Sequence, residues 1–169
     1  GWGANGENAS MVSATANALR GLCDVGVSAG DSVVEKAVKF LFASQRKNGG
    51  FSETVDVGVP WMKPGVEWGW ITATVVEALH GAGVHPSVPA FDNAGLFVRK
   101  CFWEFREGIE GQAIMIRALR NTGFRVFIET KEMKRRIDAL LPAANGGFPK
   151  VDPNLDTTLN LLAFLYDIG

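Results

Sequence analysis

The feature that most constrains the fold of this chain is a short pattern that occurs four times. Each copy has an apolar residue, a leucine three positions later and a glycine four positions after that leucine, and a hydroxyl or amide side chain stands seven positions before the leucine. The copies are Leu19-Leu22-Gly26 with Thr15, Val76-Leu79-Gly83 with Thr72, Ile116-Leu119-Gly123 with Gln112, and Leu162-Leu165-Gly169 with Thr158. The residue after the polar position is Ala16, Ala73, Ala113 or Leu159. Because five aligned positions agree across the four segments, we interpret the pattern as an internal repeat.

The spacing of this pattern predicts one helix in each copy. Positions seven and three before the leucine lie on the same side of a helix as the leucine itself, since a helix turns every ~3.6 residues. The glycine follows where a helix needs a left-handed residue at its C-terminus, and glycine adopts that conformation without a Cβ penalty. The alanines beside the polar position leave room for a neighbouring helix. We therefore expect helices of about 14 residues that are buried on more than one face.

A second set of segments, richer in charge, lies between these copies. Ser32-Val33-Val34-Glu35 has the pattern of a capping box and predicts a helix that begins at Ser32 and runs to Arg46. Its apolar residues form one stripe and its charged residues another: Val34, Val38, Leu41 and Phe42 against Glu35, Lys36 and Lys39. Residues 93–106 and 130–141 are the expected equivalents. No strand-length alternation of period two stands out, so the sequence predicts an all-α fold in which apolar and amphipathic helices alternate.

The turn from an amphipathic helix to the next apolar helix carries a second signature. Two repeats carry it in full, as Asn48-Gly49-Gly50-Phe51 and Asn145-Gly146-Gly147-Phe148. The first repeat has Gly1-Trp2 at the equivalent point, and the repeat at 92–123 keeps only Gly108 and Gly111. Glycine supplies the positive φ of a tight exit, and we expect the aromatic ring to insert between helices. An insertion at residues 52–68 lengthens the second repeat. The expected organisation is a single domain, 1–169, with repeats at about 1–26, 31–83, 92–123 and 130–169.

The overall composition excludes some classes of protein. With 17 Lys and Arg against 18 Asp and Glu the net charge is −1, and we expect no nucleic-acid partner because such a partner calls for a basic stripe. The one basic cluster, Lys131, Lys134, Arg135 and Arg136, is interrupted by Glu132 and is interpreted as a solvated helix face. No segment approaches the roughly 20 apolar residues of a membrane span. We expect a cytoplasmic protein and leave peripheral membrane contact open.

The cysteines and histidines do not form a metal-binding pattern. Cys23 and Cys101 are the only cysteines, and neither has a second cysteine or a histidine at ligand spacing. We interpret both as core or half-exposed thiols. His80 and His85 follow the end of one predicted helix, where a histidine interacts favourably with the helix dipole. The sequence therefore predicts no metal and no cofactor.

Two segments resemble the repeats of a known superfamily. Residues 45–51, Gln-Arg-Lys-Asn-Gly-Gly-Phe, resemble the QW motif (QxxxGxW, here with Phe for Trp) of squalene-hopene and oxidosqualene cyclases, and the opening GWGANGENASMVSATANALRGL resembles the GGWGE…SQTAWAL segment of the same enzymes. Protein prenyltransferase β-subunits share the repeat. The resemblance covers nearly the whole chain, more closely over 1–83 than over 93–169. It implies an α/α toroid, and since a complete toroid of this family has about six inner helices while four are visible here, it implies a partial barrel from a longer chain.

The sequence departs from these families at their reactive motifs. The acidic DxDD motif with which class II terpene cyclases protonate an alkene does not occur, and neither does the GCGEQ sequence of complement-type thioester domains. Prenyltransferase β-subunits hold zinc through Asp, Cys and His, with Asp and Cys two apart, whereas Cys23 and Asp24 are adjacent here. Glu7 and Asn8 follow the first Gly-Trp-Gly, where the corresponding acid of the cyclases braces the repeat turn, so we interpret them as structural. If the chain is a cyclase fragment, its acid is expected upstream of Gly1.

Three tryptophans form the candidate substrate-binding site: Trp61, Trp68 and Trp70, which precede or open an apolar helix. Terpene cyclases line their cavities with aromatic faces because the ring quadrupole stabilises a carbocation. In α/α toroids the pocket lies at the end where the inner helices begin, which is where these residues fall. The alternative is that the three rings pack the long loop onto the end of the barrel.

Three carboxylates are the candidate catalytic acids: Glu67, Asp152 and Asp156, each just before or at the start of a predicted apolar helix. Asp156, which precedes Thr157-Thr158, also has the pattern of an N-cap, and Glu67 suits the positive end of a helix dipole. Protonation of an alkene would need a raised pKa, and therefore burial of the carboxyl group without a cationic partner.

Together with the resemblance, these residues favour a terpenoid, triterpene-like cyclase domain that binds a polyprenyl-type apolar ligand in a central cavity. The complete enzyme would be an isomerase that cyclises by proton-initiated carbocation chemistry, while catalysis by this chain alone stays open. The alternative is a non-catalytic α/α repeat module that binds a protein or lipid partner. A zinc protein prenyltransferase β-like subunit is the least favoured interpretation.

Overall fold

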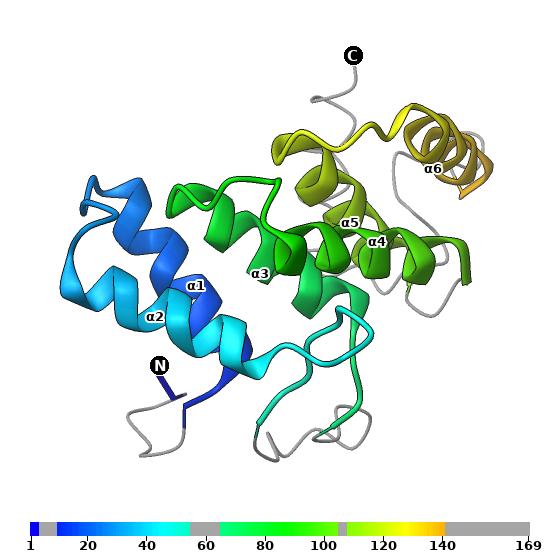
Figure 1. The fold of residues 1–169 in the computed structure, drawn as a ribbon. Helices are drawn as coiled ribbons and strands as arrows, with labels where there is room; N and C mark the ends of the chain where they lie inside the picture. The colour runs from blue at the N-terminus through cyan, green and yellow to red at the C-terminus, as the bar shows by residue number, and fades with distance from the viewer. Residues whose placement is uncertain (4–9, 55–64, 105–107, 141–169) are drawn as a thin grey trace.

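The computed structural model describes residues 1–3, 10–54, 65–104 and 108–140, and within these ranges the chain is all-helical. Its helices follow one another in the order α1 (Val12–Asp24), α2 (Ser32–Ser44), α3 (Gly69–Gly81), α4 (Pro89–Glu104), α5 (Ile109–Asn121) and α6 (Phe127–Leu140), as Figure 1 shows. The only β pairing in this part of the chain is an isolated bridge between Trp2 and Met11. The all-α prediction is confirmed. The fourth copy of the repeat, with Thr158 and Leu165, lies outside the described residues.

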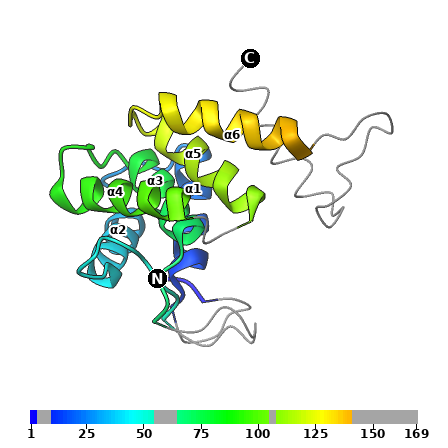
Figure 2. The same cartoon turned by 90° about the vertical axis from the view of Figure 1, so that its right-hand side faces the viewer.

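The helices are arranged as three hairpins placed side by side. α1 packs against α3 and α3 against α5, so these three helices form a continuous inner row. The outer helices pack onto this row, α2 on α1, α4 on both α3 and α5, and α6 on α5 (Figures 1 and 2). The inner helices are the ones that carry the repeat pattern. None of the helices in the described ranges is long and apolar enough to cross a membrane.

The C-terminal ends of the inner helices explain the leucine and glycine of the repeat. The glycines Gly26, Gly83 and Gly123 have φ values of +87°, +80° and +87°, as predicted for a left-handed cap. In each case the apolar residue after the glycine donates its backbone N–H to the carbonyl of the repeat leucine, at 2.9–3.0 Å: Val27 to Leu22, Val84 to Leu79, and Phe124 to Leu119. This is the Schellman arrangement, and it adds an apolar position to the repeat pattern.

The beginnings of the outer helices differ from the prediction. The capping box predicted at Ser32 is wrong, because the side chain of Asp31 accepts the backbone N–H of Val33 at 2.8 Å and Ser32 is already the first helical residue. An aspartate serves as an N-cap at least as well as a serine. α4 and α6 begin at Pro89 and Phe127, earlier than the predicted 93 and 130, and α2 ends at Ser44 rather than Arg46. Proline suits the first turn of a helix, where its missing N–H would have no partner.

The amphipathic pattern of α2 is confirmed. Val34 and Leu41 are buried and Val38 and Phe42 half-buried, while the charged stripe of Glu35, Lys36 and Lys39 is exposed.

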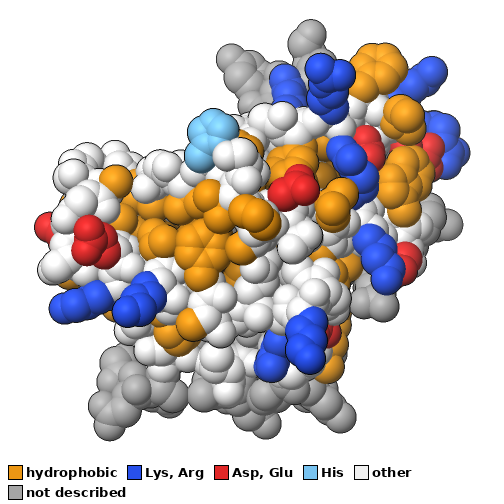
Figure 3. Space-filling view, viewed as in Figure 1, with side chains coloured by type: hydrophobic (Ala, Val, Ile, Leu, Met, Phe, Trp, Pro, Cys, Tyr) orange, Lys and Arg blue, Asp and Glu red, His pale blue; other side chains and the backbone are white. Residues whose placement is uncertain are grey.

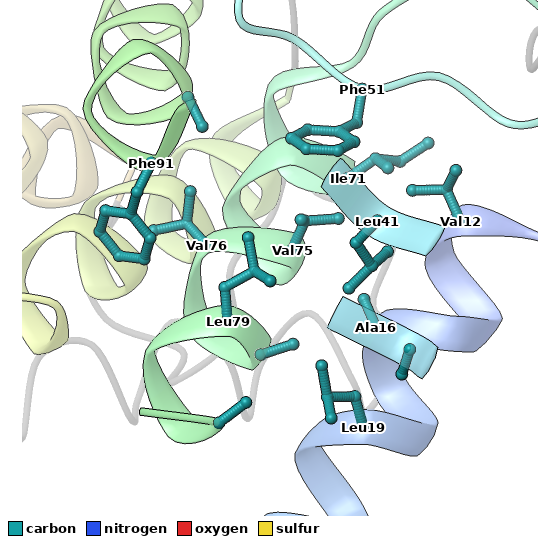
Figure 4. Close-up of a cluster of buried hydrophobic side chains, with 14 of the residues drawn as sticks. Val12, Ala16, Leu19, Leu41, Phe51, Ile71, Val75, Val76, Leu79 and Phe91 are labelled. Atoms are coloured by element: carbon teal, nitrogen blue, oxygen red, sulfur yellow. The ribbon is translucent and has the colours of Figure 1, made fainter. Parts of the chain in front are cut away.

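The buried side chains fall into two clusters. The first lies between α1, α2 and α3, where Leu19, Leu41 and Leu79 point toward one another (Figure 4). The ring of Phe51, from the turn after α2, inserts into this cluster and is 0% exposed, as predicted for the turn aromatic. The second cluster lies between α4, α5 and α6, and Phe124 packs against both. The alanine beside the polar position is buried in all three inner helices, which allows them to lie close together: Ala16, Ala73 and Ala113.

Candidate functional site

The polar position of the repeat fastens the turn to the inner helix that follows it. The Thr15 hydroxyl accepts the backbone N–H of Trp2 at 2.9 Å, and the Thr72 hydroxyl accepts that of Phe51 at 3.0 Å. The Thr72 hydroxyl in turn donates to the carbonyl of Trp68 at 2.7 Å. Because two repeats make the same bond, Gly1-Trp2 and Gly50-Phe51 are structurally equivalent, as predicted. In the third repeat the polar residue, Gln112, accepts a hydrogen bond from Arg136 of α6.

The glutamine of the QW-like segment links two consecutive hairpins. The Gln45 amide donates to the carbonyl of Gly49, at 3.0 Å, and to that of Ala90 in the first turn of α4, at 2.7 Å. Gly49 has φ +88°, the positive value expected for the turn, and a Cβ there would lie 2.3 Å from the backbone oxygen of Asn93. The motif therefore performs a structural role, in which the turn after α2 is bonded to α4.

Trp68 and Trp70 lie together at the beginning of α3. Trp68 is the N-cap residue, Trp70 lies in the first turn, and both side chains are half-buried and pack against the first hydrophobic cluster. The backbone N–H of Trp68 donates to the carbonyl of Phe51 at 3.1 Å, which brings the two tryptophans next to the turn after α2. Both rings therefore contribute to packing and also keep part of their surface accessible. Trp61, the third predicted member of the site, lies outside the described residues.

The predicted acids are only partly described. Glu67 is half-buried directly before the N-cap of α3, and its carboxylate makes no hydrogen bond or ion pair with the described part of the chain. The N-cap residue Trp68 makes no side-chain cap, and Glu67 lies near the positive end of the α3 dipole. Asp152 and Asp156 lie outside the described residues.

One buried carboxylate at this end of the molecule, Glu53, was not anticipated from the sequence. It is 1% exposed, and its oxygens accept the backbone N–H groups of Val12 at 2.9 Å and Ser13 at 3.2 Å. Helix α1 has no cap of its own, since its N-cap residue is Met11. Glu53 thus caps a helix 41 positions earlier in the chain. The signal in the sequence is a helix that lacks an adjacent capping residue.

A row of charged side chains, also not anticipated, crosses the other end of the inner helices. Arg20, Glu77 and Arg117 each stand two positions before the repeat leucine of their helix. Arg20 Nη1 lies 3.2 Å from Glu77 Oε2, and Arg117 Nε lies 3.7 Å from Glu77 Oε1. The Asn121 amide also donates to Glu77, at 3.4 Å. The alignment of the repeats could have revealed this row, because the three residues occupy one column.

The basic cluster of α6 is not a uniformly solvated face. Glu132 binds Arg135 at 2.7 Å and Arg136 at 2.9 Å, and hydrogen bonds first from Arg135 and then from Arg136 lower the pKa of Glu132 to about 2. The side chain of Arg136 is only 10% exposed, and its guanidinium lies over the ring of Phe102, 4.6 Å from the centroid. The prediction of a solvated face is therefore wrong for Arg136, which turns inward and connects α6 with α4 and α5.

The cysteines are free thiols, Cys101 buried and Cys23 half-buried, in agreement with the prediction. Burial, with a smaller contribution from Asp24, raises the pKa of Cys23. His80 lies in the last turn of α3, as expected, and His85 Nδ1 is 2.8 Å from the Ser87 hydroxyl. The described residues contain no group of three or more His, Cys, Asp or Glu side chains placed to hold a metal ion.

No protein-family model matches the chain, and no curated protein matches it significantly.

Proposed function

We propose that this chain is part of an α/α toroid of the terpenoid cyclase kind and that it binds an elongated apolar, polyprenyl-type ligand at the end where its inner helices begin. The observation that carries the proposal is the pair of half-buried rings, Trp68 and Trp70, at the start of α3. The alternation of inner and outer helices, with an inner row of parallel repeats, agrees with such an architecture.

The chemistry of the two rings suits this ligand. Apolar surface removed from water contributes about 25 cal/mol per Å², so an isoprenoid chain lying on two indoles gains affinity without specific polar contacts. The negative face of an indole also attracts a cation, which is what cyclisation through a carbocation requires. The proposal assigns no catalytic acid, and Glu67, Asp152 and Asp156 remain the candidates.

Direct binding of geranylgeraniol, measured with radiolabelled ligand in detergent micelles, tests the proposal. We expect the wild type to bind the ligand saturably. Trp70→Phe should bind equally well, because it keeps an aromatic face. Trp70→Ala and Trp68→Ala should each bind about tenfold more weakly, which corresponds to ~1.4 kcal/mol. Trp103→Ala is the matched control, since Trp103 is an exposed tryptophan near the end of α4. Equal binding by the wild type and both alanine variants at the start of α3 would contradict the proposal.

A second candidate is a non-catalytic repeat module that binds a protein partner. The surface in Figure 3 favours this second candidate. Apolar side chains gather in the area between α2 and the beginning of α4, so the outer helices do not fully cover the core there. An apolar patch of this kind is typical of interaction surfaces. A charge introduced on α2 at Val33, whose side chain is exposed, would reduce partner capture in this case and leave geranylgeraniol binding unchanged.

A further inference from the structure

A shallow cavity of about 260 Å³, wide open to solvent, lies at the end of the inner helices opposite to Trp68 and Trp70. The last turns of all three inner helices form its wall, with Arg20, Asp24, Glu77, His80, Arg117 and Asn121 beside one glycine and one threonine. The repeat itself brings these side chains together, because they occupy equivalent positions near the ends of α1, α3 and α5. The charged ends of these side chains offer polar partners to a ligand, while their aliphatic stems supply apolar surface.

Glu77 holds the two arginines of the cavity in place. Its side chain is 11% exposed, whereas those of Arg20 and Arg117 are 43% and 24% exposed. The carboxylate therefore lies beneath the two guanidinium groups and orients both of them. In the described part of the chain, the Arg20 guanidinium donates only to Glu77, and the Arg117 guanidinium makes an ion pair with Glu77 but no hydrogen bond. Since a guanidinium carries five N–H donors, most donors of this pair are available to a ligand carboxylate, which guanidinium groups bind in a planar, bidentate manner.

The opposite charge is present in the same cavity. Asp24 is exposed and makes no hydrogen bond or ion pair with the described residues, and the C-terminal ends of three helices add partial negative charge. Arg20 and Arg117 are thus balanced by Glu77 and Asp24. A simple anion would be attracted by one side of the cavity and repelled by the other, whereas a ligand with both charges would meet a complementary group at each end.

We propose that this cavity binds a small zwitterion of the class of free α-amino acids. The ligand carboxylate lies between Arg20 and Arg117, and its ammonium group lies toward Asp24 and the helix ends. The site does not depend on the proposed polyprenyl ligand, because it uses other residues at the opposite end of the inner helices.

Titration of the isotope-labelled protein with glycine, L-serine and L-glutamine, followed by amide chemical shifts, tests the proposal. We expect at least one of the three to bind with a Kd at or below about 1 mM and to shift the amides of Arg20, Asp24 and Arg117. Acetate and methylammonium each carry one half of the zwitterion and should bind at least about tenfold more weakly, since each leaves one charge of the cavity unmatched.

Two variants separate ligand recognition from a structural role of the charged row. Arg117→Gln should weaken amino-acid binding about tenfold and also lower the unfolding temperature, because it removes one partner of Glu77. Asp24→Asn should weaken binding about fivefold without lowering the unfolding temperature, because Asp24 is exposed and unbonded in the described part of the chain and lies at the negative end of α1. Lys36→Gln, on the exposed face of α2, is the control and should change neither.

Three results would overturn the proposal. The first is no chemical-shift change with any of the three amino acids at ~50 mM, a concentration at which binding would be weaker than about −2 kcal/mol. The second is acetate binding as tightly as the amino acid, and the third is unchanged amino-acid binding in Asp24→Asn. The last of these remains decisive even if Arg117→Gln fails to fold.

Discussion

The two ends of the inner helices are built in different ways, although one repeat produces both. At the C-terminal end, α1, α3 and α5 all finish on the same arrangement of leucine, left-handed glycine and apolar residue, closed by the same backbone hydrogen bonds. At the N-terminal end, α1 and α3 share the hydrogen bond from the turn to the repeat threonine, but the residues that begin the helices differ. Glu53, in the segment between α2 and α3, caps α1, whereas the N-cap residues of α3 and α5, Trp68 and Gly108, make no side-chain cap themselves.

The difference follows from the range of the contacts. A Schellman end is made by residues within six positions of one another, so it reappears wherever the local pattern does. The cap of α1 comes from much farther along the chain, since Glu53 lies 41 positions after Val12. The N-terminal end is therefore the place where one repeat can differ from the next, and the proposed apolar site lies there.

The largest expected effect comes from the turn aromatic at the N-terminal end. Phe51 is fully buried in the first cluster, so Phe51→Ala removes a complete side chain from a packed site and should cost about 3–5 kcal/mol in the free energy of unfolding. Chemical denaturation monitored by circular dichroism measures this cost. Phe127→Ala is the control, because Phe127 is 82% exposed and its replacement should change stability by less than about 0.5 kcal/mol. A cost for Phe51→Ala below about 1 kcal/mol would show that the turn is not anchored by its ring.

A smaller effect is expected at the cap that α1 receives from a distance. Glu53→Ala leaves two N–H groups of α1 without their acceptor and should cost about 2 kcal/mol. Asp31→Ala removes the local cap of α2, which makes a single exposed hydrogen bond, and should cost about 1 kcal/mol or less. The comparison would fail if the two substitutions had equal effects in the same denaturation experiment.

The C-terminal ends should respond alike to a common substitution. Gly26→Ala, Gly83→Ala and Gly123→Ala each force a Cβ into a left-handed conformation, at a cost of about 1 kcal/mol. No neighbouring atom lies within 4 Å of the added Cβ at Gly26 or Gly123, and at Gly83 the nearest is 3.9 Å away, so the cost comes from the backbone alone. If the three losses in the free energy of unfolding agree within about 0.5 kcal/mol, the three helix ends are equivalent. A spread above about 1 kcal/mol would refute that equivalence.

The same distinction explains how much could be predicted from the sequence. The inner helices of the first three repeats, their glycine ends and the buried ring of Phe51 follow from short-range patterns, and the structure confirms them. The cap of α2 was assigned to the wrong residue because Asp31 and Ser32 are both good N-caps and local sequence does not distinguish them. Glu53 and the inward-turned Arg136 depend on contacts between hairpins, which periodicity does not report. The tryptophan site was predicted by position, but how far Trp68 and Trp70 are buried by packing depends on the fold.

The smallest expected effect lies on α6, away from both ends of the inner helices, and it is a dependence on pH. Arg135 and Arg136 lower the pKa of Glu132 from 4.5 to about 2, so the folded state favours the charged carboxylate. This contribution to stability is complete above pH 4.5 and is lost as the pH falls toward 2, since the unfolded chain takes up the proton first. The difference in unfolding temperature between the wild type and Glu132→Gln should therefore be small at neutral pH and shrink between pH 4.5 and 2. Glu35→Gln, on the exposed stripe of α2, is the control and should show no such trend. If the difference in unfolding temperature between the wild type and Glu132→Gln stayed constant over this pH range, the ion pairs of α6 would contribute nothing specific to the folded state.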